Sequence, residues 1–115
     1  MIKVEIKKRK ECNYFYSLHV LGHSGFAVKG NDIVCAGVSA LVQTAYVALK
    51  ACKASKIEQY DTGKCFKIEI KNIAEDEKEK ITDYCDFLLT GLFLIEKHYP
   101  KYVKIIIMED KDGTS

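Results

Sequence analysis

The residues of this chain best suited to catalysis are Cys35 and His23, which lie twelve positions apart in a glycine-rich stretch. A thiol becomes a strong nucleophile when it ionises, and a neighbouring imidazole favours that ionisation. Cys35 falls in the first turn of an expected helix, where the helix dipole and unpaired backbone N–H groups also favour the thiolate. Residue types and spacing therefore predict a cysteine nucleophile with a lowered pKa and a histidine base.

Each residue of this stretch also has a purely structural interpretation. Cys35 could be a small residue packed near a helix start, and His23 could have no chemical role. Asp32 either caps the helix or orients His23 or an incoming substrate. Ser39, one helical turn after Cys35, either hydrogen-bonds into the site or bonds back to a helix carbonyl. Spacing alone leaves these alternatives open.

The other cysteines indicate neither a disulfide framework nor a metal site. The chain has an odd number of cysteines, 5, and no two of them lie close together in the sequence. Zinc sites and redox Cys-x-x-Cys motifs both need closely spaced pairs. We therefore expect no metal and no cofactor. The remaining four are interpreted as small buried apolar residues: Cys12, Cys52, Cys65 and Cys85.

Composition excludes several other classes of protein. The chain has 115 residues, of which 48% are hydrophobic and 30% charged, with a net charge of +2. We expect a single catalytic domain over residues 1–110 and a frayed polar tail at 111–115. The balanced charge does not require a nucleic-acid partner. We also expect no signal peptide and no membrane span, which indicates a cytoplasmic protein.

Apolar periodicity predicts six elements. Alternation of apolar and polar residues predicts strands at 2–6, 14–20 and 65–71, the first two forming an antiparallel hairpin. In the second strand, Tyr14, Tyr16, Leu18 and Val20 are expected to share one face. Apolar steps of three and four predict helices at about 32–54 and from the acidic residues 75–77 to Pro100. A final apolar run at 102–108 predicts an interior strand or a subunit contact.

This order of elements predicts an α+β fold. It is a two-layer sandwich with a mixed four-stranded sheet and two helices on one face, in the order strand, strand, helix, strand, helix, strand. Residues 56–64 are interpreted as a polar connection, and residues 22–30 as a mobile loop because three glycines fall within it. Gly37 lies inside the first helix, which suggests that a strand or the loop passes close to its backbone.

Two segments, 22–27 and 30–41, resemble the signature of the ribosomal-processing cysteine protease Prp family. The likeness extends to chain length and element order. It implies a cytosolic endopeptidase that removes a short N-terminal extension from a large-subunit ribosomal protein and acts as a homodimer. By this resemblance His23 is the general base and Cys35 the nucleophile. Substrate-binding or neighbouring positions are Gly22, Ser24, Gly25, Phe26, Asp32 and Ser39.

The resemblance implies attack of the Cys35 sulfur on a peptide carbonyl and a thioester intermediate. Backbone N–H groups at the helix start, including that of Cys35, are expected to stabilise the oxyanion. An apolar groove beside Cys35 is expected, walled by Phe26 and Val28. Two rival hypotheses remain: a non-catalytic module that binds the ribosome or another protein, and a different thiol acyl transfer such as thioester hydrolysis.

Overall fold

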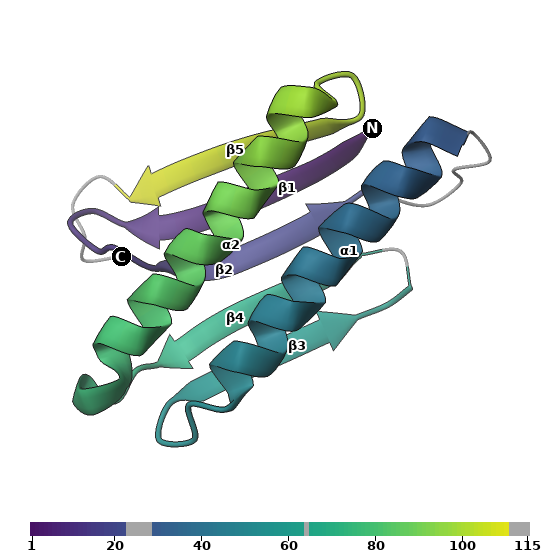
Figure 1. Cartoon of the computed structure of the whole chain (residues 1–115). Coiled ribbons are helices and arrows are strands. Elements are labelled where there is room, and N and C mark those ends of the chain that lie inside the picture. Colours follow the sequence, from purple (N-terminus) through teal and green to yellow (C-terminus); the bar gives the residue numbers. More distant parts are fainter. Residues whose placement is uncertain (23–28, 64, 111–115) are drawn as a thin grey trace.

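Five strands form one mixed sheet, and two helices cover one of its faces (Figure 1). The computed structural model describes residues 1–22, 29–63 and 65–110, without the side chains of residues 29–32. The strands are β1 (Ile2–Arg9), β2 (Phe15–Leu21), β3 (Lys56–Asp61), β4 (Phe66–Asn72) and β5 (Val103–Asp110). The helices are α1 (Lys29–Lys50) and α2 (Lys78–His98), with a 3-10 turn at Glu75–Glu77. The predicted α+β class and two helices are confirmed.

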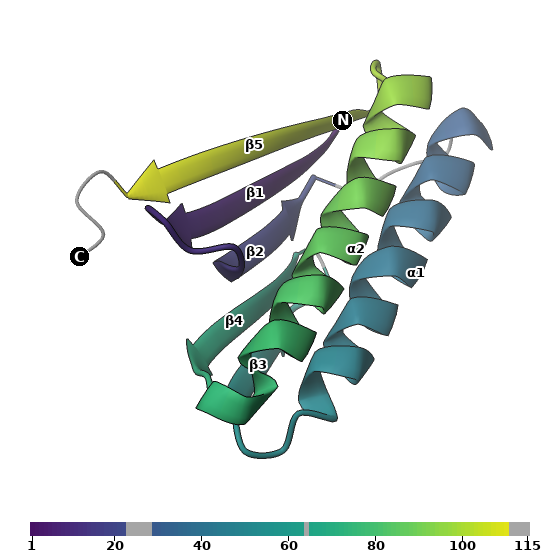
Figure 2. The ribbon, with the colours of Figure 1, turned by 60° about the vertical axis from the view of Figure 1, so that its left-hand side comes forward.

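The strand order is β3-β4-β2-β1-β5. β1 pairs parallel with β5, while the β1–β2, β2–β4 and β3–β4 pairs are antiparallel. The predicted hairpin of the first two strands is confirmed, with Val4 opposite Val20. α1 and α2 lie side by side on the same face of the sheet (Figure 2).

The prediction of four strands is wrong, because residues 56–61 form β3 at one edge of the sheet. Only Ile57 of this strand is fully buried, so the sequence lacks the apolar alternation of a half-buried strand. Charged side chains are common on edge strands, where they discourage pairing with other chains. Backbone pairing with β4 places β3 in the sheet, with Asp61 opposite Phe66.

The inward face of β2 also differs from the prediction. The register of the β1–β2 pair shifts at this point, because Ser17 lies opposite Lys7 and Phe15 lies opposite Lys8. This β-bulge adds one residue to β2 and reverses the inward–outward alternation of the β2 residues that precede it. Phe15 is therefore buried in the core, whereas Tyr16 stacks under the Arg9 guanidinium, 4.4 Å from the ring centre.

β5 is an edge strand, so the interior strand predicted from its apolar run is wrong, and the alternative of a subunit contact stays a prediction. Val103 is buried against the helices, but Ile107 and Met108 are exposed. The Ile105 N–H donates to Glu96 Oε2 of α2 at 2.8 Å. A carboxylate from the helical layer thus closes part of this edge.

One core lies between the helices and the sheet. The buried stripe predicted for α2 is confirmed at Ile81, Cys85, Leu88 and Leu92. On α1 the residues buried in this core are Val34, Val38, Val42, Ala45 and Leu49. Helix boundaries differ from the prediction: α1 begins before residue 32 and ends before residue 54, and the acidic residues 75–77 form the 3-10 turn that precedes α2.

Helix α1 has an unusual composition. It carries no charged residue between Ile33 and Leu49, and the segment Ile33–Lys50 is long and apolar enough to cross a membrane. In the fold this helix packs one side on the sheet, which explains only part of that apolar character. Gly37 faces α2, where an added Cβ would lie 3.4 Å from Ile95 Cδ1. The close neighbour expected at Gly37 is therefore the second helix, not a strand.

Candidate active site

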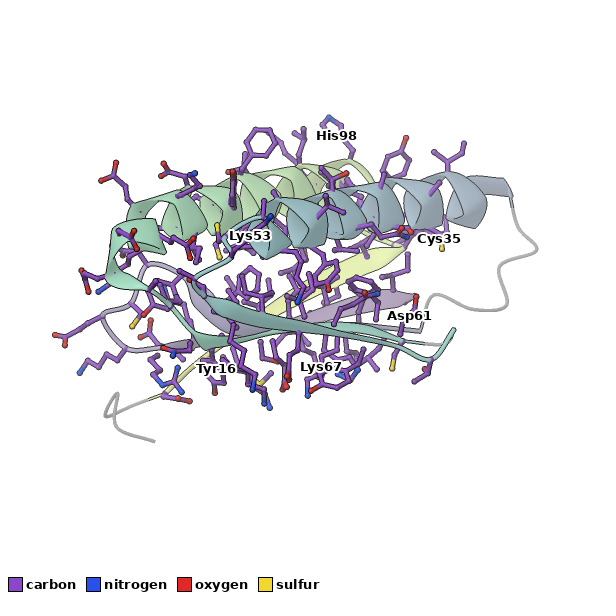
Figure 3. All side chains as sticks on the ribbon, turned by 90° about the horizontal axis from the view of Figure 1, so that it is seen from below. Tyr16, Cys35, Lys53, Asp61, Lys67 and His98 are labelled. Carbon is purple, nitrogen blue, oxygen red and sulfur yellow. The ribbon has the colours of Figure 1, made fainter. Side chains whose placement is uncertain are left out.

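Cys35 lies on α1, at the wall of a small pocket between this helix and the sheet. The thiol residue is half-buried, and the pocket has a volume of about 100 Å³. Figure 3 shows Cys35 on the sheet-facing side of α1, with Asp61 on the sheet at the same end of the molecule. The other lining residues are Ile2, Val20, Val38, Ser39, Val42, Gln43 and Phe66. A thiol thus borders a small apolar hollow with a few polar groups at its wall.

The helix start does not lie at Cys35. α1 begins at Lys29, so Cys35 is beyond the first turn, whose four N–H groups lack intrahelical acceptors. The helix dipole acts most strongly within that first turn. The expectation that Cys35 lies in the first turn is therefore wrong. By helix geometry, the N–H groups without an acceptor inside the helix are those of residues 29–32.

Ser39 and Gln43 place polar atoms on the α1 wall of the pocket. Gln43 Nε2 donates a hydrogen bond to Ser39 Oγ at 2.6 Å, one turn along the helix. The Ser39 hydroxyl therefore takes part in a side-chain pair that lines the pocket with Cys35. Ser39 was predicted from the sequence, whereas Gln43 was not, although its spacing of four residues from Ser39 places it on the same face of the helix.

Asp61 is a pocket residue that the sequence analysis did not identify as functional. It ends β3, the strand that the periodicity did not predict. Its Oδ1 accepts a hydrogen bond from the Gly63 N–H at 2.9 Å, which fixes the side chain in an Asx turn. The sequence Asp61-Thr62-Gly63 carries that turn signal, but only the sheet pairing brings it to Cys35.

Gly22 directly follows β2, the strand whose Val20 lines this pocket. Its φ is +73°, and an added Cβ would lie 2.6 Å from the Met1 carbonyl oxygen. Val20, two residues earlier, lines the pocket. The end of β2 thus lies beside the pocket that Cys35 borders.

Several predicted residues lie outside the described part of the structure. These are His23, Ser24, Gly25, Phe26 and Val28. The backbone of Asp32 belongs to α1, but its side chain also lies outside the described part of the structure. The distance between the His23 ring and the Cys35 sulfur therefore stays a prediction. Within residues 1–22, 29–63 and 65–110, no group of three His, Cys, Asp or Glu side chains could hold a metal ion.

The remaining cysteines differ from Cys35 in burial and chemistry. Cys52 and Cys85 are buried, as predicted, while Cys12 and Cys65 are half-buried. Burial raises the pKa of the Cys85 thiol to about 12 and also raises the pKa of Cys52. A thiol with such a pKa stays protonated at neutral pH and reacts slowly.

Alkylation rates should separate these thiols in the folded protein. At about pH 8, Cys85 is about 0.01% ionised and shielded, so iodoacetamide should leave it unmodified while Cys35 reacts fastest. Peptide mass spectrometry at increasing times measures each rate, with Cys12 as the half-buried comparison. A rate–pH profile of Cys35 that coincides with that of Cys12 would contradict an activated thiol.

Comparison with known proteins identifies the family. The family model for the cysteine protease Prp (Peptidase_Prp) matches residues 1–104, nearly the whole chain. The chain belongs to this family. Prp proteins are cysteine proteases, so the family predicted from the two sequence segments is confirmed. No curated protein sequence gives a significant match.

Three solved structures are similar to this Prp family member. SMU.848 from Streptococcus mutans is 27% identical, with a TM-score of 0.82 and 96% of each chain covered. The essential ribosomal processing protease Prp from S. aureus in complex with a substrate peptide is 23% identical, with a TM-score of 0.80. The same protein with a covalently linked product peptide is 24% identical, with a TM-score of 0.77. For both S. aureus structures, 94% of this chain and 100% of the other are covered. The S. aureus structures show that this chain shares their fold.

Proposed function

We propose that this protein is a cytoplasmic endopeptidase that removes a short N-terminal extension from a large-subunit ribosomal protein. Cys35 is the nucleophile and His23 the general base. The observation that carries the proposal is the position of the Cys35 thiol at an apolar pocket between α1 and the sheet, which Val20 near the end of β2 also lines. Membership of a cysteine protease family supports the reaction class.

The proposed reaction needs only these two side chains and a water molecule. His23 takes the proton of the Cys35 thiol, and the sulfur attacks the scissile carbonyl carbon. The peptide C–N bond then breaks, and the leaving amine takes the proton from His23. Water, deprotonated by His23, hydrolyses the thioester, releases the carboxylic acid product and restores the thiol. The covalently linked product in the S. aureus relative fits such a nucleophilic mechanism.

The oxyanion of the tetrahedral intermediate needs hydrogen-bond donors near the sulfur, each worth roughly 3 kcal/mol in other enzymes. The Cys35 N–H is unsuited, because a group in the second turn of a helix already has an acceptor. The N–H groups of residues 29–32, which have no acceptor inside the helix, are the donors that we propose. They lie about 5–9 Å from Cys35 along the helix axis, so substrate binding must bring the carbonyl toward the helix start.

The pocket suggests how an extended segment binds. Its walls are mainly apolar side chains of β1, β2, β4 and α1, and Asp61, Ser39 and Gln43 supply the polar atoms. We propose that an apolar side chain of the ribosomal extension fills this pocket beside the scissile bond. Gly22, Ser24, Gly25 and Phe26 would then contact the substrate from the β2–α1 connection. We also propose that the active form is a homodimer that needs no cofactor, membrane or nucleic acid.

A cleavage assay tests the proposal. The purified chain is incubated with a peptide that copies the ribosomal extension, and mass spectrometry identifies the products. Cleavage at one bond, with transient addition of the acyl fragment to Cys35, is expected. Binding of the peptide without cleavage would support the non-catalytic module instead. Hydrolysis of a small thioester with no peptide cleavage would indicate the other acyl-transfer reaction.

A further inference from the structure

The pocket beside Cys35 is bordered by a carboxylate that the proposed reaction does not use. Asp61 is the only acidic or basic residue among the described residues that line this pocket. Ser39 and Gln43 are polar but neutral, and apart from Cys35 the remaining lining residues are apolar. A few polar groups at the wall of an apolar pocket decide which ligand fits, and a charged group selects the charge of that ligand.

Strand pairing places Asp61 at the rim of the pocket. Asp61 of β3 lies opposite Phe66 of β4, and Phe66 lies opposite Val20 of β2. These three residues form a row across the sheet, and all of them line the pocket. Phe66 and Val20 are buried, whereas Asp61, on the edge strand, is exposed. The row therefore leads from an apolar floor to a carboxylate that solvent and ligands can reach.

The turn after β3 holds this carboxylate in place. The Gly63 N–H donates to Asp61 Oδ1 at 2.9 Å, and the Thr62 N–H donates to the Cys65 carbonyl at 3.1 Å across the turn. A side chain held in this way loses little further freedom when a ligand binds to it. Because the two oxygens of a carboxylate can together accept about four hydrogen bonds, Asp61 keeps the capacity to bind a donor.

The described part of the chain supplies no cation to this carboxylate. None of the ion pairs among residues 1–22, 29–63 and 65–110 includes Asp61. Lys67 of the neighbouring strand lies on the face of the sheet away from the helices (Figure 3) and pairs there with Glu69 at 3.1 Å. On the α1 wall, the neutral Gln43 and Ser39 are hydrogen-bonded to each other. The negative charge at the rim is therefore available to a ligand.

We propose that Asp61 determines the specificity of this site by pairing with a lysine or arginine side chain of the bound peptide, while an apolar side chain of that peptide fills the pocket. The inference rests on the proposed function and narrows its substrates to segments with a basic residue near an apolar one. Proteins that bind RNA carry many lysine and arginine residues, so a ribosomal substrate can supply them. A glutamate or aspartate at the same position of the peptide is repelled by Asp61.

The basic residue of the peptide should lie close to the scissile bond. The Cys35 thiol and the Asp61 carboxylate border the same small pocket. A lysine side chain reaches about 6 Å from its Cα, and an extended peptide rises about 3.3 Å per residue. We therefore expect the selected basic residue within about three residues of the bond that is cut.

Peptide binding to the full chain carrying Cys35→Ala tests the inference without any cleavage. Fluorescence anisotropy gives Kd for a peptide that copies the ribosomal extension, with lysine, glutamine or glutamate placed in turn at each position. At one position, lysine should bind at least about 5-fold more tightly than glutamine, and glutamate more weakly than glutamine. The preference should shrink as the salt concentration rises from about 0.05 M to 0.5 M, because a pair at the rim of a pocket is screened. This peptide series needs no substitution at Asp61.

Asp61→Asn removes the charge and keeps the turn, because an asparagine Oδ1 can accept the same Gly63 N–H. It should abolish the preference for lysine over glutamine, and Asp61→Lys should reverse it in favour of glutamate. Glu58→Gln is the matched control, since it makes the same change of charge on β3 at a residue that does not line the pocket. It should keep the preference, and circular dichroism checks the fold of each variant.

Three results would overturn the inference. They are equal binding of the lysine and glutamine peptides at every position, no binding of any peptide at up to about 1 mM, and a preference for lysine that survives Asp61→Asn. A uniform loss of binding in Asp61→Asn, with the lysine-to-glutamine ratio unchanged, is the third of these and would assign the carboxylate a structural role. Cleavage of the same peptides by the chain with Cys35 intact tests the proposed function separately. Cleavage without a preference for lysine would remove this inference alone, and a preference without cleavage would remove only the peptidase.

Discussion

Cys35→Ala should reduce the rate of peptide cleavage at least about 1,000-fold, because the reaction loses the atom that forms the thioester. The side chain is half-buried at the pocket wall, and alanine is a good helix former, so α1 should persist. The loss should appear in kcat, while the peptide still binds. His23→Ala should have a similar effect, since the base and the nucleophile act as one unit.

Cys12→Ala is the matched control for this experiment. It makes the same chemical change in a half-buried thiol that does not line the pocket. It should leave kcat within about two-fold of the wild type. Retention of cleavage in Cys35→Ala, with circular dichroism unchanged, would remove the proposed mechanism. Equal losses in both variants would indicate damage to the fold rather than to the chemistry.

The parts of the fold that sequence predicted well are those where apolar periodicity is strong. The stripe Ile81, Cys85, Leu88 and Leu92 repeats through α2 and is buried as expected. The antiparallel β1–β2 hairpin was also predicted correctly. On α2 and on β1 one face is apolar over several turns or alternations, so burial of these two elements has a single solution.

The failures share a physical cause, which is that backbone pairing does not need apolar side chains. β3 buries only Ile57 fully, and its place in the sheet comes from hydrogen bonding to β4. The bulge in β2 exchanges the inward positions of Phe15 and Tyr16 without any signal in the alternation itself. Such features depend on the partner strand, which a local pattern does not contain.

In the candidate site, too, residues marked by a local sequence pattern were predicted, and the residue placed there by strand pairing was not. Cys35 was found by residue type and by a motif, and Ser39 by helical spacing from it. Asp61 was missed because it reaches the pocket through β3, about 26 residues farther along the chain. The position of Cys35 within the helix was also wrong, because a boundary error of a few residues moves a group out of the first turn. Electrostatic arguments from helix ends are sensitive to such an error.

Gly22→Ala should lower the free energy of unfolding by at least about 2 kcal/mol. The left-handed φ of +73° costs an L-residue about 1–2 kcal/mol. In addition, the new methyl would overlap the Met1 carbonyl oxygen, which lies 2.6 Å from the position of its carbon. That oxygen cannot easily move, because it shares a peptide plane with the Ile2 N–H, which donates to the Tyr102 carbonyl at 2.7 Å. Relief of the overlap therefore weakens the pairing of β1 with its neighbours.

Gly63→Ala separates the two contributions in this prediction. Gly63 has a similar φ of +83°, but nothing lies within 4 Å of an added Cβ. It should cost only the backbone strain of about 1–2 kcal/mol, measured like Gly22→Ala by urea denaturation with an unchanged m-value. Cleavage should fall in Gly22→Ala, because Gly22 sets the direction in which the chain continues to His23, and remain in Gly63→Ala. Equal destabilisation by the two substitutions would mean that the start of β1 yields freely, and that Gly22 is needed for its φ alone.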